Sequence, residues 1–176
     1  MRCNKSYMLQ NEINSNIEKL KKELYTCLSG KNLTVATAES CTGGMIGATL
    51  TSIPGISSHY GYGFVTYSNE AKQKLIDVNL QTLELYGAVS SQVAMEMAEG
   101  TLRVSGADIA VSATGIAGPG GGTAEKPVGL VYVGYAAAGK TSFKKLNLTG
   151  DRETVRKKTV ENVLELILNI AENYKR

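Results

Sequence analysis

Glycine is confined to the middle of this chain. All 19 glycines of the 176 residues lie from Gly30 to Gly150, and the two flanks contain none. Glycine inside a helix costs roughly 1 kcal/mol relative to alanine, so glycine-free flanks favour helices, whereas a glycine-rich middle favours short elements and turns. The sequence therefore predicts a helix at each end, around a core of alternating strands and helices.

Apolar spacing supports both terminal helices. In the first flank, apolar residues recur three and four positions apart from Ile13 to Leu28, which indicates an amphipathic helix ending near Ser29-Gly30. In the last flank the same spacing runs from Val155 to Ile170, with Asp151 as the expected N-cap. Each helix is expected to bury one face against the middle of the chain.

Between the flanks, β-rich runs alternate with helical runs. The sequence predicts strands at 33–38, 60–67, 108–113, 128–137 and 141–148, and helices at 44–52, 70–76, 80–86 and 91–104. The last two strands are joined by Ala138-Gly139-Lys140, which predicts an antiparallel hairpin. Strand–helix alternation with one hairpin predicts an α/β fold in which helices cover both faces of a mixed sheet.

Length and composition are those of one ordinary globular domain. The chain is 43% hydrophobic and 20% charged, which excludes general disorder. No apolar run approaches the ~18 residues that span a bilayer, so we expect no membrane association. The cysteines are odd in number and unpaired in spacing, which favours a reducing cytoplasm over a disulfide framework. They are Cys3, Cys27 and Cys41.

The distribution of charge argues against a nucleic-acid partner. The formal net charge is +3, but residues 30–150 contain eight basic and eight acidic side chains, with Arg103 as the only arginine. A nucleic-acid-binding domain would be expected to carry a basic stripe, and this chain has none.

His59 is the only histidine, which excludes a metal site built on several histidines.

The first candidate loop, AESCTGG, follows the first predicted strand and opens a helix. Backbone N–H groups at a helix start can bind an anion or stabilise an oxyanion. Thr42, Gly43 and Gly44 are small enough for a ligand to approach the backbone. Ser40 and Cys41 are two candidate nucleophiles. The alternative is structural, with Ser40 or Thr42 serving only as the helix cap.

The second candidate loop follows the third predicted strand and has five glycines within residues 115–122. Ordering so many glycines costs backbone entropy, and such loops can cradle phosphate through main-chain N–H groups. No Gly-Lys-Ser/Thr follows, so this is not a Walker A loop. A phosphate site and a flexible surface loop both remain open.

The third candidate loop, TYSNEAK, could supply a base for Ser40. Burial beside other cations can lower the pKa of Lys72 until it serves as a base, whereas the alternative is an ordinary surface lysine. His59 begins the strand that Tyr67 ends, so parallel strands would place His59 at the opposite end of the sheet from Ser40. Position therefore favours Tyr67 and Lys72 over His59 as the proton-handling groups.

Two charged residues flank these loops. Glu39 is adjacent to Ser40, and we expect its side chain to point away and to have a structural role. Arg152 lies between the last strand and the last helix, which makes it a candidate phosphate clamp.

Six stretches of this sequence, in this order, resemble the CinA C-terminal domain family, whose stand-alone members are nicotinamide-nucleotide amidases. The resemblance covers about residues 12–174 and implies a single domain at 13–176 after an N-terminal tail at 1–12. It also implies a three-layer α/β/α sandwich with a mixed, mostly parallel five-stranded sheet, usually in a homo-oligomer. The stretches are AESCTGG, GFVTYSNEAK, YGAVS, SATGIAGPGGG, EKPVGLV and TGDRE.

The resemblance further implies hydrolysis of the carboxamide of nicotinamide mononucleotide, a small-molecule substrate, to nicotinic acid mononucleotide and ammonia, without metal or organic cofactor. By position it makes Ser40 the nucleophile and Tyr67 with Lys72 the proton-handling pair. Two alternatives remain: a non-catalytic nucleotide-binding regulatory domain, and Cys41 as nucleophile. The residues matching the family's substrate-binding positions are Thr42, Gly43, Gly44, Gly115, Gly118, Gly120 and Arg152.

Overall fold

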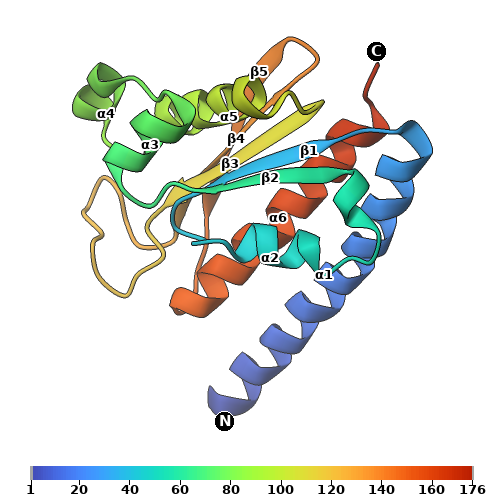
Figure 1. Ribbon diagram of the computed structural model, residues 1–176. Helices are drawn as coiled ribbons and strands as arrows, with labels where there is room; N and C mark the ends of the chain where they lie inside the picture. The colour runs from blue at the N-terminus through green and yellow to red at the C-terminus, as the bar shows by residue number, and fades with distance from the viewer. Residues whose placement is uncertain (1, 176) are drawn as a thin grey trace.

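The structure, a computed structural model, is a five-stranded sheet between two layers of helices (Figure 1). It describes residues 2–175, with side chains from Met8 onward. The strands are β1 (Val35–Glu39), β2 (Tyr60–Val65), β3 (Ile109–Gly115), β4 (Leu130–Ala137) and β5 (Lys140–Asn147). The helices are α1 (Arg2–Lys31), α2 (Met45–Thr51), α3 (Asn69–Ile76), α4 (Leu80–Tyr86), α5 (Ser91–Ser105) and α6 (Arg152–Glu172), with a short 3-10 helix η1 (Ile56–Ser58).

The sheet has the order β2-β1-β3-β4-β5 and is mixed. β1 pairs in parallel with β2 and β3, whereas β4 runs antiparallel to both β3 and β5. The β4–β5 turn has positive φ at Ala138 and Gly139, as a tight two-residue hairpin requires. Four strands therefore point the same way, and the predicted α/β fold with a mixed, mostly parallel sheet is confirmed.

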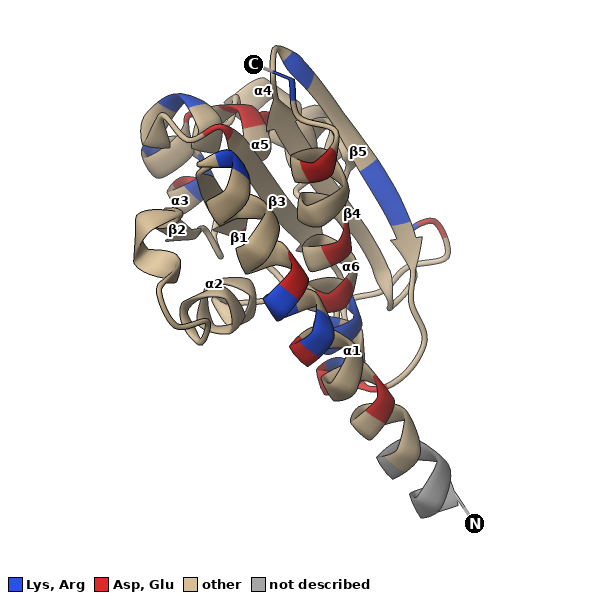
Figure 2. Ribbon diagram, turned by 90° about the vertical axis from the view of Figure 1, so that its right-hand side faces the viewer, with Lys and Arg blue, Asp and Glu red and all other residues tan. Residues whose placement is uncertain are grey.

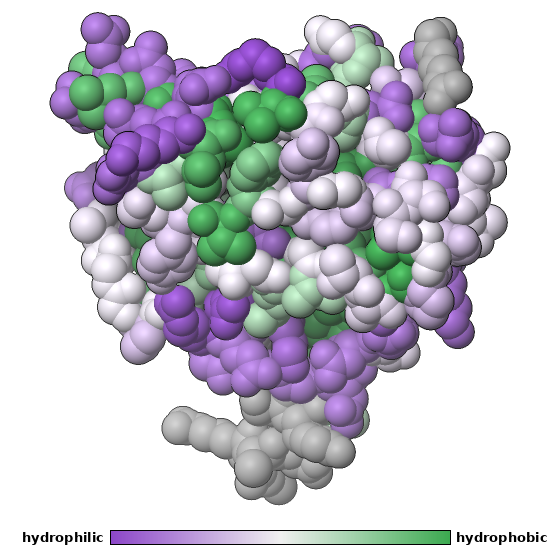
Figure 3. Space-filling model, in the orientation of Figure 1, coloured by the Kyte–Doolittle hydropathy of each residue, from purple (hydrophilic) through white to green (hydrophobic). Residues whose placement is uncertain are grey.

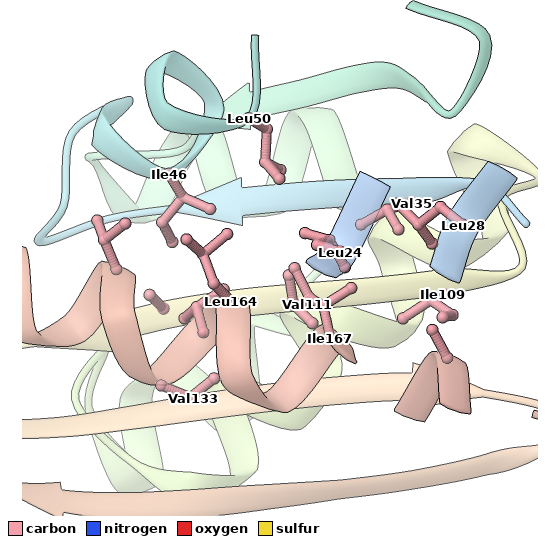
Figure 4. Packing of buried hydrophobic residues seen from close by; sticks show 14 of the residues in the cluster. Leu24, Leu28, Val35, Ile46, Leu50, Ile109, Val111, Val133, Leu164 and Ile167 are labelled. Atoms are coloured by element: carbon pink, nitrogen blue, oxygen red, sulfur yellow. The ribbon is translucent and has the colours of Figure 1, made fainter. Parts of the chain in front are cut away.

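The two faces of the sheet carry different helices (Figures 1 and 4). α1, α2 and α6 lie over the larger apolar cluster on one face, and α5, with α3 and α4 packed against it, covers the other face over a smaller cluster. Figure 2 shows charged residues spread over α1 and α6 and along β5. The larger cluster includes Leu24, Leu28, Val35, Ile46, Leu50, Ile109, Val111, Val133, Leu164 and Ile167, and the smaller one Ala38, Ile76, Val78, Leu83, Val93 and Met97.

The first helix is longer than its apolar periodicity predicted. α1 begins at Arg2, so residues 2–12, expected as a tail, continue the helix; Met1 lies outside the described residues. Cys27 and Cys41 are free thiols, and the side chain of Cys3 lies outside the described part. Within residues 2–175, no helix combines the length and apolarity that crossing a membrane demands.

Candidate active site

Three loops meet at one end of the sheet because β1, β2 and β3 are parallel and their carboxyl ends lie together. Ser40 follows β1, and its N–H donates to the carbonyl of Ala113 on β3 (2.9 Å). Thr66 follows β2, and its N–H donates to the carbonyl of Glu39 (2.8 Å). Backbone hydrogen bonds therefore fix the starts of the first and third candidate loops relative to each other.

Ser40 and Lys72 meet at this end. Lys72 lies on α3, is 1% exposed, and its Nζ lies 3.3 Å from Ser40 Oγ and donates to the carbonyl of Thr66 at 2.8 Å. Ser68 fixes the start of α3, because its hydroxyl accepts from the N–H of Ala71 (3.0 Å). The N-cap of α3 and the end of β2 thus place Lys72 Nζ next to Ser40 Oγ.

The surroundings of Lys72 favour its neutral form. Among the described residues no carboxylate forms an ion pair with it. Burial lowers the pKa of Lys72 below that of an exposed lysine, and the neighbouring Cys41 opposes this shift only in part. A neutral amine beside a hydroxyl can accept its proton, which is the arrangement of serine–lysine nucleophilic catalysis.

His59 lies away from this pair, near the start of β2. Its ring Nδ1 donates to the carbonyl of Leu33 (2.9 Å), and its Nε2 hydrogen bonds with Ser29 Oγ (3.0 Å). These contacts tie the end of α1 to the start of β1. The only histidine of the chain therefore joins structural elements rather than facing Ser40.

Gly44 is the N-cap residue of α2, and the Glu39 side chain, rather than that of Ser40 or Thr42, caps the N–H groups at the start of this helix. The 2%-exposed carboxylate of Glu39 accepts from the N–H groups of Gly44 (3.0 Å), Ile46 (3.0 Å) and Gly47 (2.7 Å). An ionised carboxylate satisfies several unpaired N–H groups at once and opposes the positive end of the helix, which a hydroxyl cannot match. The capping alternative for Ser40 and Thr42 was therefore wrong, whereas the structural role expected of Glu39 is present.

This cap limits which amides of the first loop remain for a ligand. Gly43 N–H donates to the Ser40 carbonyl (3.0 Å), and Gly44 N–H donates to Glu39, so both are already paired. Within the described residues, the amides of Cys41 and Thr42 have no backbone acceptor. Thr42 is fully buried, and its hydroxyl oxygen has no partner in the same part of the chain. Gly43 and Gly44 are small, as ligand approach to the backbone requires, but their N–H groups already donate to acceptors within the protein.

Arg156 is a residue that the sequence reasoning missed. It lies one turn after Arg152 on α6, and its Nη2 donates to the carbonyl of Thr42 (2.6 Å). The available signal was the i, i+4 spacing, which places both arginines on the same side of the helix. α6 therefore presents two guanidinium groups to the loops, one of them against the first candidate loop.

Tyr67 and Arg152 form a second group at the rim. The Tyr67 side chain is 62% exposed, and its hydroxyl accepts from Arg152 Nη2 (3.3 Å). Arg152 Nη1 also donates to the carbonyl of Gly118 (2.8 Å). No hydrogen bond joins Tyr67 to Ser40 or Lys72 within residues 8–175. The structure thus joins Tyr67 to Arg152, which also contacts the glycine-rich loop, rather than to Lys72.

The three glycines predicted for nucleotide binding differ in their surroundings. A Cβ on Gly115 would lie 2.6 Å from the Leu130 carbonyl, and one on Gly118 would lie 2.7 Å from a Val128 methyl group. A Cβ on Gly120 would meet nothing within 4 Å. Packing therefore requires the first two glycines whether or not a ligand binds, whereas Gly120 is open.

Cys41 is a poorer candidate nucleophile than Ser40. It is 6% exposed, and desolvation raises the pKa of its thiol to about 12. The thiolate is the reactive form of cysteine, and an inert buried cysteine is the usual result of such a shift.

Among the described residues, no three His, Cys, Asp or Glu side chains cluster closely enough to hold a metal ion.

Comparisons with known proteins point to one family. Residues 17–171 match the family model described as CinA C-terminal domain. A protein from Clostridium novyi, provisionally named competence-damage inducible protein, is 57% identical over 83% of this chain and 35% of its own length. A similarly named protein from Acetivibrio thermocellus is 50% identical over 90% of this chain and 41% of its own. The chain therefore spans little more than a third of these curated relatives.

Solved structures agree closely in fold. A competence/damage-inducible protein from Agrobacterium tumefaciens is 46% identical, with a TM-score of 0.85 over 88% of this chain and 96% of its own. A CinA-superfamily protein from Escherichia coli is 38% identical, with a TM-score of 0.84 over 88% of this chain and 90% of its own. Unlike the curated relatives, these structures match the chain over nearly their full length.

Proposed function

This chain belongs to the CinA C-terminal domain family, and from that premise we propose that it is an amidase that hydrolyses the carboxamide of nicotinamide mononucleotide. The substrate is the one that the motif resemblance implies. The observation that carries the proposal is the 3.3 Å contact between Ser40 Oγ and the buried Nζ of Lys72. A buried lysine without an acidic partner is costly to keep charged, so its neutral form is available as a base.

In the first half-reaction, Ser40 Oγ attacks the carboxamide carbon while its proton passes to neutral Lys72 Nζ. The tetrahedral intermediate then collapses as the C–N bond breaks, and the Lys72 ammonium gives that proton to the leaving nitrogen, which departs as ammonia. In the second half-reaction, Lys72 takes a proton from water, the hydroxide attacks the acyl ester, and the proton returns to Ser40. The products are the carboxylic acid and ammonia, without any metal or organic cofactor.

The other residues position the substrate in this proposal. The amides of Cys41 and Thr42 are the oxyanion donors that remain, since those of Gly43 and Gly44 are paired within the protein. Arg152 and the glycine-rich loop hold the phosphate. Because Tyr67 contacts Arg152 rather than Lys72, we assign it to the substrate rim and assign proton transfer to Lys72 alone.

The test is ammonia release from nicotinamide mononucleotide by the purified chain without added metal. Ser40→Ala is expected to lower the rate at least 1000-fold while leaving the circular dichroism spectrum unchanged. Ser57→Ala, which alters an exposed serine within η1, is the matched control and should keep full activity. Turnover near that of the wild type in Ser40→Ala would reject the mechanism. Calorimetric binding of the mononucleotide without ammonia release would instead favour the regulatory-domain alternative.

A further inference from the structure

Arg156 is a partly buried cation on α6 that forms no ion pair with any of the described residues. Its Nε is buried without a hydrogen-bond partner in the same part of the chain, and its Nη2 donates to the Thr42 carbonyl. In Figure 3 the surface around the start of α6 is hydrophilic. Taking a charge out of water without an acidic partner costs free energy, and a structural tie between two elements does not require a charge. This cation therefore favours a role in the site.

A chain of hydrogen bonds leads from this guanidinium to the turn that carries Ser40. Arg156 Nη2 donates to the Thr42 carbonyl (2.6 Å). The N–H of the same peptide unit belongs to Gly43 and donates to the Ser40 carbonyl (3.0 Å). That carbonyl in turn shares its peptide unit with the N–H of Cys41, which has no backbone acceptor among the described residues. Two peptide units thus connect the guanidinium to an N–H group that is left for a ligand.

The turn and its neighbours hold this chain in place. Gly43 has a φ of +57°, and a Cβ there would lie 3.6 Å from Arg156 Nη2. The Thr42 carbonyl also accepts from the N–H of Met45 (3.2 Å), at the start of α2. Desolvation raises the pKa of the Cys41 thiol, and Arg156 is among the groups that oppose this rise. The positive charge of Arg156 therefore acts on the residue that carries the unpaired N–H.

We infer that Arg156 is a positioning residue for the oxyanion site, acting through these two peptide units on the N–H of Cys41; the inference rests on the proposed amidase function. A hydrogen bond to a carbonyl polarises the peptide unit, which makes its N–H a stronger donor, and successive bonds reinforce one another. Negative charge develops on the carboxamide oxygen only as Ser40 attacks. A stronger donor therefore lowers the barrier without tightening the binding of substrate.

The two arginines of α6 then have separate tasks. Arg152 holds the phosphate in the proposed mechanism, which affects substrate binding, whereas Arg156 affects the chemical step. The test is ammonia release by Arg156→Ala, with kcat and KM determined separately. kcat is expected to fall about 30-fold, less than the roughly 100- to 1000-fold cost of losing a direct oxyanion donor. KM is expected to stay within about twofold of the wild-type value.

The matched control is Arg103→Ala, which removes the same charge from an exposed ion pair with Asp77 (2.9 Å) and should leave kcat and KM unchanged. Circular dichroism would verify that both variants fold. Arg156→Lys keeps the positive charge on a flexible chain and is expected to retain more of kcat than Arg156→Ala. It provides the same comparison if the alanine variant does not fold. Equal kcat values in folded Arg156→Lys, folded Arg156→Ala and wild type would overturn the inference.

Chemical rescue separates this role from that of a neutral structural tie. Guanidinium and urea have the same planar shape and both donate N–H groups, but only guanidinium carries a charge. Guanidinium at millimolar concentration is expected to raise kcat of Arg156→Ala several-fold, whereas urea at the same concentration should not. Equal rescue by urea, or a loss confined to KM, would contradict the inference.

Nuclear magnetic resonance of the free protein tests the hydrogen-bond chain without any turnover. The Gly43 amide proton is expected to move upfield in Arg156→Ala, because its bond to the Ser40 carbonyl weakens, and to keep its wild-type shift in Arg103→Ala. A wild type that releases no ammonia would reject the amidase proposal and leave this measurement intact. An unchanged Gly43 shift in Arg156→Ala would reject the inference about Arg156, whatever the activity of the wild type.

Discussion

At the scale of single residues, Lys72 has the most unusual surroundings. An ammonium group is almost never fully buried unless it is paired, and the two hydrogen-bond partners of Lys72, Ser40 Oγ and the Thr66 carbonyl, are both uncharged. Carbonyl and hydroxyl oxygens can stabilise a cation but cannot neutralise it. The lysine therefore has a lowered pKa because of where β2 ends and α3 begins.

This environment predicts a pH dependence. Because burial lowers the pKa of Lys72, the neutral base is present at lower pH than for a free lysine of pKa about 10.4. kcat/KM should rise with pH through the lowered pKa and then reach a plateau, with its midpoint below that of free lysine. The measurement is ammonia release across the pH range in which the fold is intact. A midpoint at or above the value for free lysine would contradict the base assignment.

The same pKa shift predicts the sign of a stability change. Between the lowered pKa in the folded state and the ordinary pKa in the unfolded state, the unfolded chain binds more protons at Lys72. Stability from this group therefore rises with pH across that window. In Lys72→Met this rise should be absent, which chemical denaturation at several pH values would show.

At the scale of elements, local patterns predicted most of what was found. Ser90 and Asp151 cap α5 and α6 through side-chain hydrogen bonds to residues three positions on, which lie within reach of a sequence pattern. The cap of α2 was missed because Glu39 is the last residue of β1 and reaches N–H groups five to eight residues ahead. Such a contact depends on the path of the turn between them, and sequence spacing alone does not define it.

The Glu39 cap predicts a coupled loss of stability and activity. Glu39→Gln keeps the shape but replaces one acceptor oxygen with an NH₂ group that would face N–H donors. The free energy of unfolding should fall by roughly 1–3 kcal/mol. kcat/KM should fall as well, because the same turn carries Ser40.

The matched control is Asn79→Ala, which removes the exposed cap of α4 (2.8 Å to the N–H of Gln81). Its loss should cost about 1 kcal/mol without affecting kcat/KM. Denaturant unfolding and ammonia release, measured on both variants, would separate the two effects. Equal activity in Glu39→Gln and wild type would show that the α2 cap does not position Ser40.

At the scale of the whole molecule, much of the main core lies away from the candidate site. The larger apolar cluster lies under α1, α2 and α6 and reaches the site at Cys41, whereas Ser40 and Lys72 lie where β1 and β2 end. The sequence predicted a sheet with helices on both faces, but nothing local in it assigned each helix to a face. Likewise, the contact of Arg156 with Thr42 joins positions 114 residues apart. Contacts of this kind come from the tertiary arrangement, which periodicity and propensity do not encode.

The separation of core and site predicts that stability can be lost without loss of chemistry. Leu24 on α1 is completely buried in the larger cluster, and Leu24→Ala should lower the free energy of unfolding by about 2–5 kcal/mol through lost burial and the cavity left behind. Below its lowered melting temperature, kcat should stay within about twofold of wild type, because no contact of Ser40 or Lys72 changes. Leu85→Ala, at a 77%-exposed position on α4, is the control and should change stability by at most ~0.5 kcal/mol. If folded Leu24→Ala lost turnover as severely as Ser40→Ala, the core under α1 would be part of the catalytic geometry, and the two regions could not be treated as independent.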